Sequence, residues 1–203
     1  MKRFFVLTSI LWLTSCQSQY IDQKFLFELE RQAYAWGFYH SGMYIDNTGK
    51  IYQYEYKGYQ DTVSLEAKEE IFLIDKEWLS EEELMKKYSF HKEIKIEGRI
   101  PRNLLFEKYQ LIKTVSEGEL LSSNRRIGGD AGSVRLLAYQ YDQTRRQYRR
   151  IVLLSANPQQ MNSSQSTQLL TDWLINLWFH DKQQGYGDLK QSQEELEKDL
   201  FRN

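Results

Sequence analysis

The sequence predicts an α+β fold in which a mainly antiparallel sheet, built from two or more hairpins, packs with amphipathic helices. The first observation is that two pairs of β-prone segments are each joined by turn residues, within 38–56 and 134–155. The second is that apolar residues recur at helical spacing after residues that favour helix N-termini. Abundant aromatic residues (14%) and only two prolines indicate a packed domain, not a disordered chain.

The clearest predicted hairpin joins residues 38–45 to 50–56 through Asp46-Asn47-Thr48-Gly49. Asx residues followed by glycine suit such a turn, with Gly49 in the left-handed region. If Asp46 pairs with Lys50, Tyr44 lies opposite Tyr52. One face then carries aromatic side chains and one histidine: Phe38, His40, Tyr44, Tyr52, Tyr54 and Tyr56. We expect the helix that bears Trp36 or Trp173 to cover part of this tyrosine face.

A second hairpin is predicted from residues 134–141 and 148–155, joined by 142–147. Residues 151–154 are apolar on both faces, so this strand should be central in the sheet. Residues 122–132 and 157–162 are expected to form loops.

Helices are predicted in five places. The first covers 22–36, because Phe25, Leu29, Ala33 and Trp36 follow a helical spacing after a capping Asp22. Residues 64–90 are expected to be helical, with a capping box from Ser80 to Glu83. Others should begin near Pro101, at Ser163 or Ser166, and near residue 192. In the fourth helix, Trp173, Leu174 and Leu177 should be buried together with Val152.

The N-terminus has the features of an export signal. Lys2 and Arg3 precede a run of apolar and small residues over 4–13, and Leu13-Thr14-Ser15 leads into Cys16, the only cysteine. This segment resembles the lipobox of bacterial lipoproteins. The resemblance implies that Cys16 is diacylated and that the chain is cut just before it. The predicted organisation is a signal peptide over 1–15, the lipidated cysteine with a short tether over 16–21, one globular domain over 22–182, and a helical tail over 183–203.

The same resemblance predicts an exported protein held on a membrane by lipid. The apolar run is too short to span a bilayer as a helix. Gln17, which follows the cysteine, favours the outer membrane in a diderm bacterium; in a monoderm the chain would lie on the outer face of the plasma membrane. The alternative is an ordinary secretory signal with a cysteine at position 16 by chance. A domain whose single thiol carries lipid must be stable without disulfides.

Partners and cofactors are constrained by composition and spacing. Losing Lys2 and Arg3 with the signal changes 27 basic residues to 25 against 28 acidic ones, a net charge of −3, which argues against nucleic acid as a partner. None of the three histidines has the spacing of a sequence-local zinc motif, so no metal and no cofactor are predicted. The membrane and a protein in the cell envelope are the expected partners.

Catalytic candidates are few. His40 lies on the tyrosine face and could act as a general base, although cross-strand aromatic packing explains a histidine there as well. Asp130 is a second catalytic candidate. Arg125 and Arg126 precede a glycine-rich stretch and could hold an anion, or they lie in a plain connection to the next strand.

A basic hairpin tip, with Arg145, Arg146, Arg149 and Arg150, could touch anionic lipid headgroups or be a solvated turn. The leading hypothesis is an envelope lipoprotein of unknown biochemical activity that serves as a lipid-anchored binding domain. The alternatives are an immunity-type lipoprotein that neutralises a periplasmic toxin, a small envelope hydrolase that uses His40 or Asp130, and an assembly accessory of an envelope machine.

Overall fold

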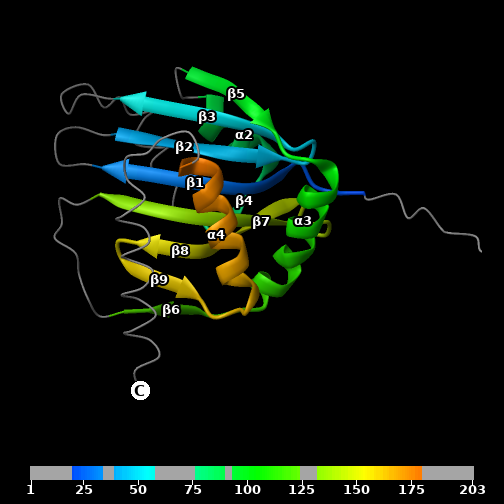
Figure 1. The fold of residues 1–203 in the computed structure, drawn as a ribbon, viewed down its shortest axis with the longest axis vertical. Helices are drawn as coiled ribbons and strands as arrows, with labels where there is room; N and C mark the ends of the chain where they lie inside the picture. Colours follow the sequence, from blue (N-terminus) through cyan, green and yellow to red (C-terminus); the bar gives the residue numbers. More distant parts are fainter. Residues whose placement is uncertain (1–19, 34–38, 58–75, 90–92, 124–131, 180–203) are drawn as a thin grey trace, which may run out of the picture.

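The structure is a computed structural model, and it describes residues 20–33, 39–57, 76–89, 93–123 and 132–179. Within these residues, nine strands form one antiparallel sheet, which confirms the predicted α+β class. The order across the sheet is β5-β3-β2-β1-β7-β8-β9-β6, and the short β4 pairs with β8 (Figure 1). In chain order the elements are β1 (Phe25–Ala33), β2 (Tyr39–Asp46), β3 (Lys50–Lys57), β4 (Trp78–Leu79), α2 (Glu81–Ser89), β5 (Glu93–Arg99), α3 (Arg102–Ser116), β6 (Leu120–Ser122), β7 (Ser133–Asp142), β8 (Gln147–Ala156), β9 (Gln159–Asn162) and α4 (Ser166–Phe179).

The two faces of the sheet bury different kinds of side chain. The face covered by α3 and α4 is aliphatic, and it includes Leu29, Leu136, Leu105 and Leu174. The opposite face is aromatic; α2 covers it with Leu84 and Tyr88, and Leu79 of β4 belongs to the same cluster. Figure 1 shows α3 and α4 in front of the sheet and α2 behind it. None of the described helices is long and apolar enough to cross a membrane.

The first predicted hairpin is confirmed as β2 and β3. Tyr44 pairs with Tyr52 and His40 with Tyr56, which is the predicted register. Gly49 has φ +81°, and its carbonyl oxygen accepts a hydrogen bond from the Ile100 amide at 2.6 Å. A side chain at position 49 would meet that backbone, so this turn requires glycine.

The predicted helix over 22–36 is wrong, because residues 25–33 form β1, in the middle of the sheet. A period of two accounts for the strand: Phe27 and Leu29 face the aliphatic core, while Glu28 and Glu30, which alternate with them, face the aromatic side. Two buried glutamates in a central strand resemble the exposed face of a helix when only the sequence is considered. Trp36 lies outside the described residues.

The second hairpin is confirmed as β7 and β8, and β8 lies between β7 and β9 as a central strand. The predicted loop over 157–162 is wrong from residue 159 onward. Gln159–Asn162 forms β9, and it pairs with both β8 and β6. In the predicted loop over 122–132, residues 124–131 lie outside the described part of the chain.

The helices near Pro101 and Ser166 are confirmed as α3 and α4. In the predicted helical region 64–90, residues 64–75 lie outside the described part, and Trp78–Leu79 is the strand β4. The capping box begins α2: Ser80 Oγ accepts from the Glu83 amide, and the Glu83 carboxylate accepts from the Ser80 amide. The expected last helix near residue 192 also lies outside the described residues.

Two packing predictions need correction. The helix with Trp173 covers the aliphatic face, where Trp173 contacts Phe27 edge-on, and α2 covers the tyrosine face instead. The side chain of Val152 is half-buried and is not part of the aliphatic core that α4 covers. In the sheet register, Val152 pairs with Leu137. The register shifts between Leu136 and Leu137, so Leu153 and Leu154 supply the buried residues there.

Candidate functional site

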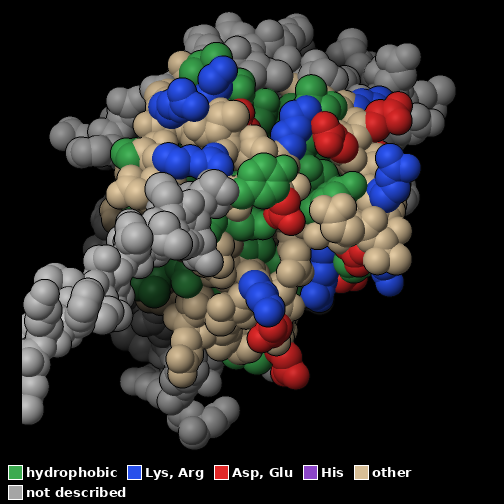
Figure 2. Space-filling view, turned by 90° about the vertical axis from the view of Figure 1, so that its right-hand side faces the viewer, with side chains coloured by type: hydrophobic (Ala, Val, Ile, Leu, Met, Phe, Trp, Pro, Cys, Tyr) green, Lys and Arg blue, Asp and Glu red, His purple; other side chains and the backbone are tan. Residues whose placement is uncertain are grey.

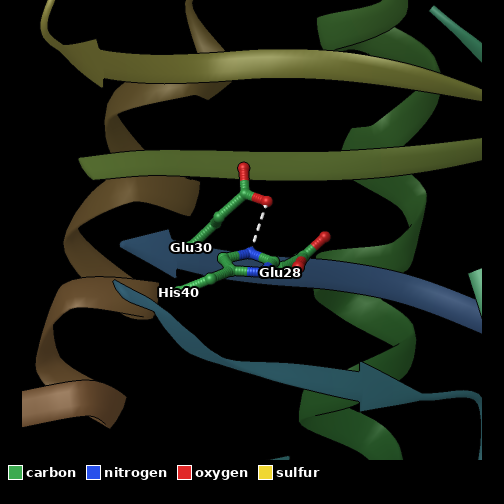
Figure 3. A group of neighbouring side chains, drawn as sticks. All are labelled: Glu28, Glu30 and His40. Atoms are coloured by element: carbon green, nitrogen blue, oxygen red, sulfur yellow. Dashed lines mark hydrogen bonds and ion pairs between the residues drawn. The ribbon is translucent and has the colours of Figure 1, made fainter. Parts of the chain in front are cut away.

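The aromatic face contains a buried set of ionisable groups, which we call the polar core. Its members come from β1, β2, β3, β7 and α2, and they are in contact with one another. They are Glu28, Glu30, His40, Tyr54, Lys87, Tyr88, Arg135 and Tyr139. Figure 3 shows Glu28, Glu30 and His40 grouped over the sheet, with His40 directed at the Glu30 carboxylate.

Glu30 is completely buried, and three partners satisfy its carboxylate. His40 Nε2 lies 2.9 Å from Oε1, and Lys87 Nζ lies 3.0 Å from the same oxygen. Arg135 Nε donates to Oε2 at 2.9 Å. A buried carboxylate is tolerated only with such pairing, because burial alone would strongly favour its neutral form.

Glu28 is equally buried and is bound mainly by tyrosine hydroxyls. Tyr54 donates to Oε1, while Tyr139 and Tyr88 donate to Oε2. Lys87 Nζ also donates to Oε2, at 2.8 Å. The Lys87 ammonium therefore bridges Glu28 and Glu30. The two carboxylates are balanced by the two cations Lys87 and Arg135.

The order of the strands brings these side chains together. β1 lies between β2 and β7, so Glu30 reaches His40 on one neighbour and Arg135 on the other. Tyr54 reaches across β2, where its partner in the register is Gly42. A methyl group at Gly42 would collide with the Leu29 carbonyl oxygen and with the Tyr54 side chain, so glycine leaves room both for the neighbouring strand and for this aromatic bridge.

Burial and charge shift the pKa values of the polar core in two directions. Burial alone would raise the pKa of Glu30, but the charges of Lys87 and Arg135 and the His40 hydrogen bond hold it well below its usual value. Burial raises the pKa values of Tyr54, Tyr88 and Tyr139 well above normal, and the Glu28 charge raises them further. These groups thus favour ionised Glu30 and neutral tyrosines.

We expect a pH window of stability from these shifts. Ionised Glu30 adds to the free energy of unfolding at pH values above about 4.3, which is the pKa of a glutamate in the unfolded chain. This contribution is lost as the pH falls below that value. Stability from the three buried tyrosines is present below the unfolded pKa of about 10 and is lost as pH rises above it. Urea unfolding across this range should show a falling midpoint at both ends. An unchanged midpoint between about pH 7 and pH 11 would contradict the tyrosine contribution.

Three members of the polar core have the residue types of a metal site. Ligand atoms of Glu28, Glu30 and His40 all lie within 4.8 Å of one another, although they come from two strands and have no local spacing in the sequence. Lys87 Nζ already lies within 3.0 Å of both carboxylates. A divalent cation would need to displace this ammonium, so the group fits an internal ion-pair network better than a metal centre.

The sequence-predicted site residues fall in different places. His40 belongs to the polar core; it is 2% exposed and contacts the Tyr54 ring edge-on at 5.2 Å. Cys16, Arg125, Arg126 and Asp130 lie outside the described residues. The hairpin tip keeps Arg145 and Arg146 exposed, while Arg149 pairs with Glu77.

Sequence reasoning missed Glu30, which contacts His40, and the Glu28 and Lys87 side chains that complete the ion-pair network. The available signal was the alternation of Phe27 and Leu29 with Glu28 and Glu30, a period of two that suits a strand. No family model matches the chain, and neither a characterised protein nor a solved structure is significantly similar to it.

Proposed function

We propose that the chain is an exported bacterial lipoprotein whose α+β domain is a lipid-anchored binding module of the cell envelope. The observation that carries the proposal is the ending Leu13-Thr14-Ser15-Cys16, which closes a run of apolar and small residues that follows a basic start. Acyl chains on Cys16 would hold the protein on the membrane, since two or more chains anchor stably where one does not. With Gln17 next, the outer membrane is the proposed location in a diderm bacterium.

The geometry of the polar core argues against His40 as the general base of a hydrolase. A general base must reach the proton that it removes, within hydrogen-bond distance or through one water. His40 is buried, and its Nε2 already contacts Glu30. Within the described residues, the ionisable groups of the polar core bind one another beneath α2. The role that this arrangement supports is structural: the ion pairs of Lys87 with Glu28 and Glu30 hold α2 on the sheet.

Acylation is tested by replacing Cys16 with serine. Cells supplied with an alkyne-bearing fatty acid should label the wild-type chain, and Cys16→Ser should abolish the label because it removes the acceptor thiol. Ser15→Ala is the matched control, since it keeps a small residue before the cysteine and should leave labelling unchanged. Labelling of Cys16→Ser at the wild-type level would contradict the proposal.

A further inference from the structure

We propose that the end of the sheet where β1 begins docks on the anionic headgroups of the membrane that holds the anchor. This inference rests on the proposed acylation of Cys16. The surface, called here the anchor end, consists of residues 20–24, the β2–β3 turn, the β5–α3 link and the β7–β8 turn (Figure 1). Figure 2 views the molecule from this side and shows Lys and Arg side chains spread over it, with acidic and apolar side chains between them.

Hydrogen bonds hold these segments together around the start of β1. The Asn47 amide donates to the Lys24 carbonyl at 2.9 Å, which fixes the β2–β3 turn beside the start of β1. The Tyr141 amide donates to Gln23 Oε1 at 3.0 Å, so the β7–β8 hairpin is fixed on the other side. The anchor end is therefore a single surface, although its segments are distant in the sequence.

The basic side chains of this surface are exposed at its rim. Arg99 Nε donates to the Thr48 carbonyl, and Arg102 donates to the Asn47 carbonyl, so both guanidinium groups lie on the β2–β3 turn. On the other flank, Arg145 and Arg146 are exposed in the β7–β8 turn, and Arg145 lies 4.3 Å from the centroid of the Trp78 ring. Guanidinium groups suit phosphate-bearing headgroups because they donate forked hydrogen bonds.

The acidic side chains between them are engaged in the turns. Asp46 Oδ1 accepts from the Thr48 and Lys50 amides, and Asp142 Oδ1 accepts from the Thr144 and Arg145 amides. Asp22 accepts from the Tyr109 hydroxyl. The basic part of the anchor end is bounded by α2, because the first turn of α2 is acidic. In that turn, Glu81 forms an ion pair with Lys24.

The length of the tether favours a membrane over any other occupant. Three residues lie between Cys16 and Tyr20, and the four Cα–Cα steps that join these two residues span at most about 14 Å when fully extended. Acyl chains on Cys16 would thus keep the anchor end close to the headgroups. Tyr20 is 72% exposed, and its amphipathic ring suits the membrane–water interface. Short reach and positive charge together select this end as the face that meets the lipid.

A single-label experiment tests this orientation. Cys16 is the only cysteine, so once it is acylated an introduced cysteine is the sole free thiol. Gln143→Cys places a fluorophore in the β7–β8 turn, and Ala156→Cys places one at the opposite end of β8. The acylated protein is reconstituted into vesicles of phosphatidylcholine with phosphatidylglycerol, and nitroxide headgroup lipids quench the label. We expect strong quenching at 143 and weak quenching at 156.

Charge reversal and salt separate electrostatic docking from simple proximity. Arg102→Glu should lower the ratio of docked to undocked protein at least about fivefold, since each charge near an anionic surface changes this equilibrium by about that factor. Lys113→Glu, near the other end of α3, is the matched control and should have little effect. Raising the salt from about 0.1 M to 1 M shortens the screening length from roughly 10 Å to 3 Å and should also reduce quenching at 143.

The outcomes are distinct. Equal quenching at both labels, or quenching at 143 that ignores phosphatidylglycerol, salt and Arg102→Glu, would overturn the assignment of this surface. If the wild-type chain fails to float with vesicles of any composition, the anchor itself is wrong, and the surface assignment is wrong with it.

Discussion

Replacing Lys87 with methionine should lower the free energy of unfolding by about 3–5 kcal/mol, because it leaves two buried carboxylates without their shared cation. Lys87 Nζ lies 2.8 Å from Glu28 and 3.0 Å from Glu30, and all three side chains are almost fully buried. Methionine keeps the length and the apolar stem of lysine, so the measured loss reports mainly on charge. Urea unfolding followed by tryptophan fluorescence gives the free energy.

Lys86→Met is the matched control, since Lys86 is the exposed neighbour on the same helix. It should change stability by no more than about 0.5 kcal/mol. Adding Glu28→Gln to the Lys87→Met variant removes one of the uncompensated charges and should recover part of the loss. A loss below about 1 kcal/mol for Lys87→Met would contradict the role assigned to the polar core.

Leu174→Ala should cost about 2–5 kcal/mol, because it opens a cavity between α4 and the aliphatic face of the sheet. Leu174 is 0% exposed and belongs to the core that includes Leu105 and Leu136. Leu169, five positions earlier on the same helix, is 58% exposed, so Leu169→Ala is the matched control.

Leu169→Ala should have an effect within about 0.5 kcal/mol. Equal losses for the two variants, measured by the same unfolding assay, would mean that α4 packs through a different face. The aliphatic core described for α3 and α4 would then be wrong.

The fold was predictable where turn chemistry and periodicity agree. The Asp46–Gly49 turn fixed the register of β2 and β3, and the capping box at Ser80 marked the start of α2. β1 was not predicted, because Phe25, Leu29 and Ala33 also fit a helical stripe. In such a helix, Glu28 and Glu30 would lie on the face exposed to solvent, and only their partners in the folded protein show that they are buried. Those partners are 10 to 111 residues away in the sequence, so local patterns do not reveal them.

The candidate site was predictable only in part. His40 was selected for its position among tyrosines, and the structure places it against the Tyr54 ring. Lys87 lies on a short helix whose periodicity alone does not show that this lysine points inward. Burial of a lysine depends on an acidic pair on the facing sheet. The helical spacing of Phe25, Leu29 and Ala33 conceals that pair, because in a helix over 22–36 the two carboxylates would face solvent.

We propose that Cys16 is the acylated first residue of the mature chain, and mass spectrometry of the membrane-extracted protein would show this group directly. We expect an N-terminal peptide that begins at Cys16 and carries a diacylglyceryl group on the thiol. Residues 1–15 should be absent from the mature protein. A mature chain that begins at another residue, or a Cys16 without lipid, would rule out lipid anchoring at this cysteine.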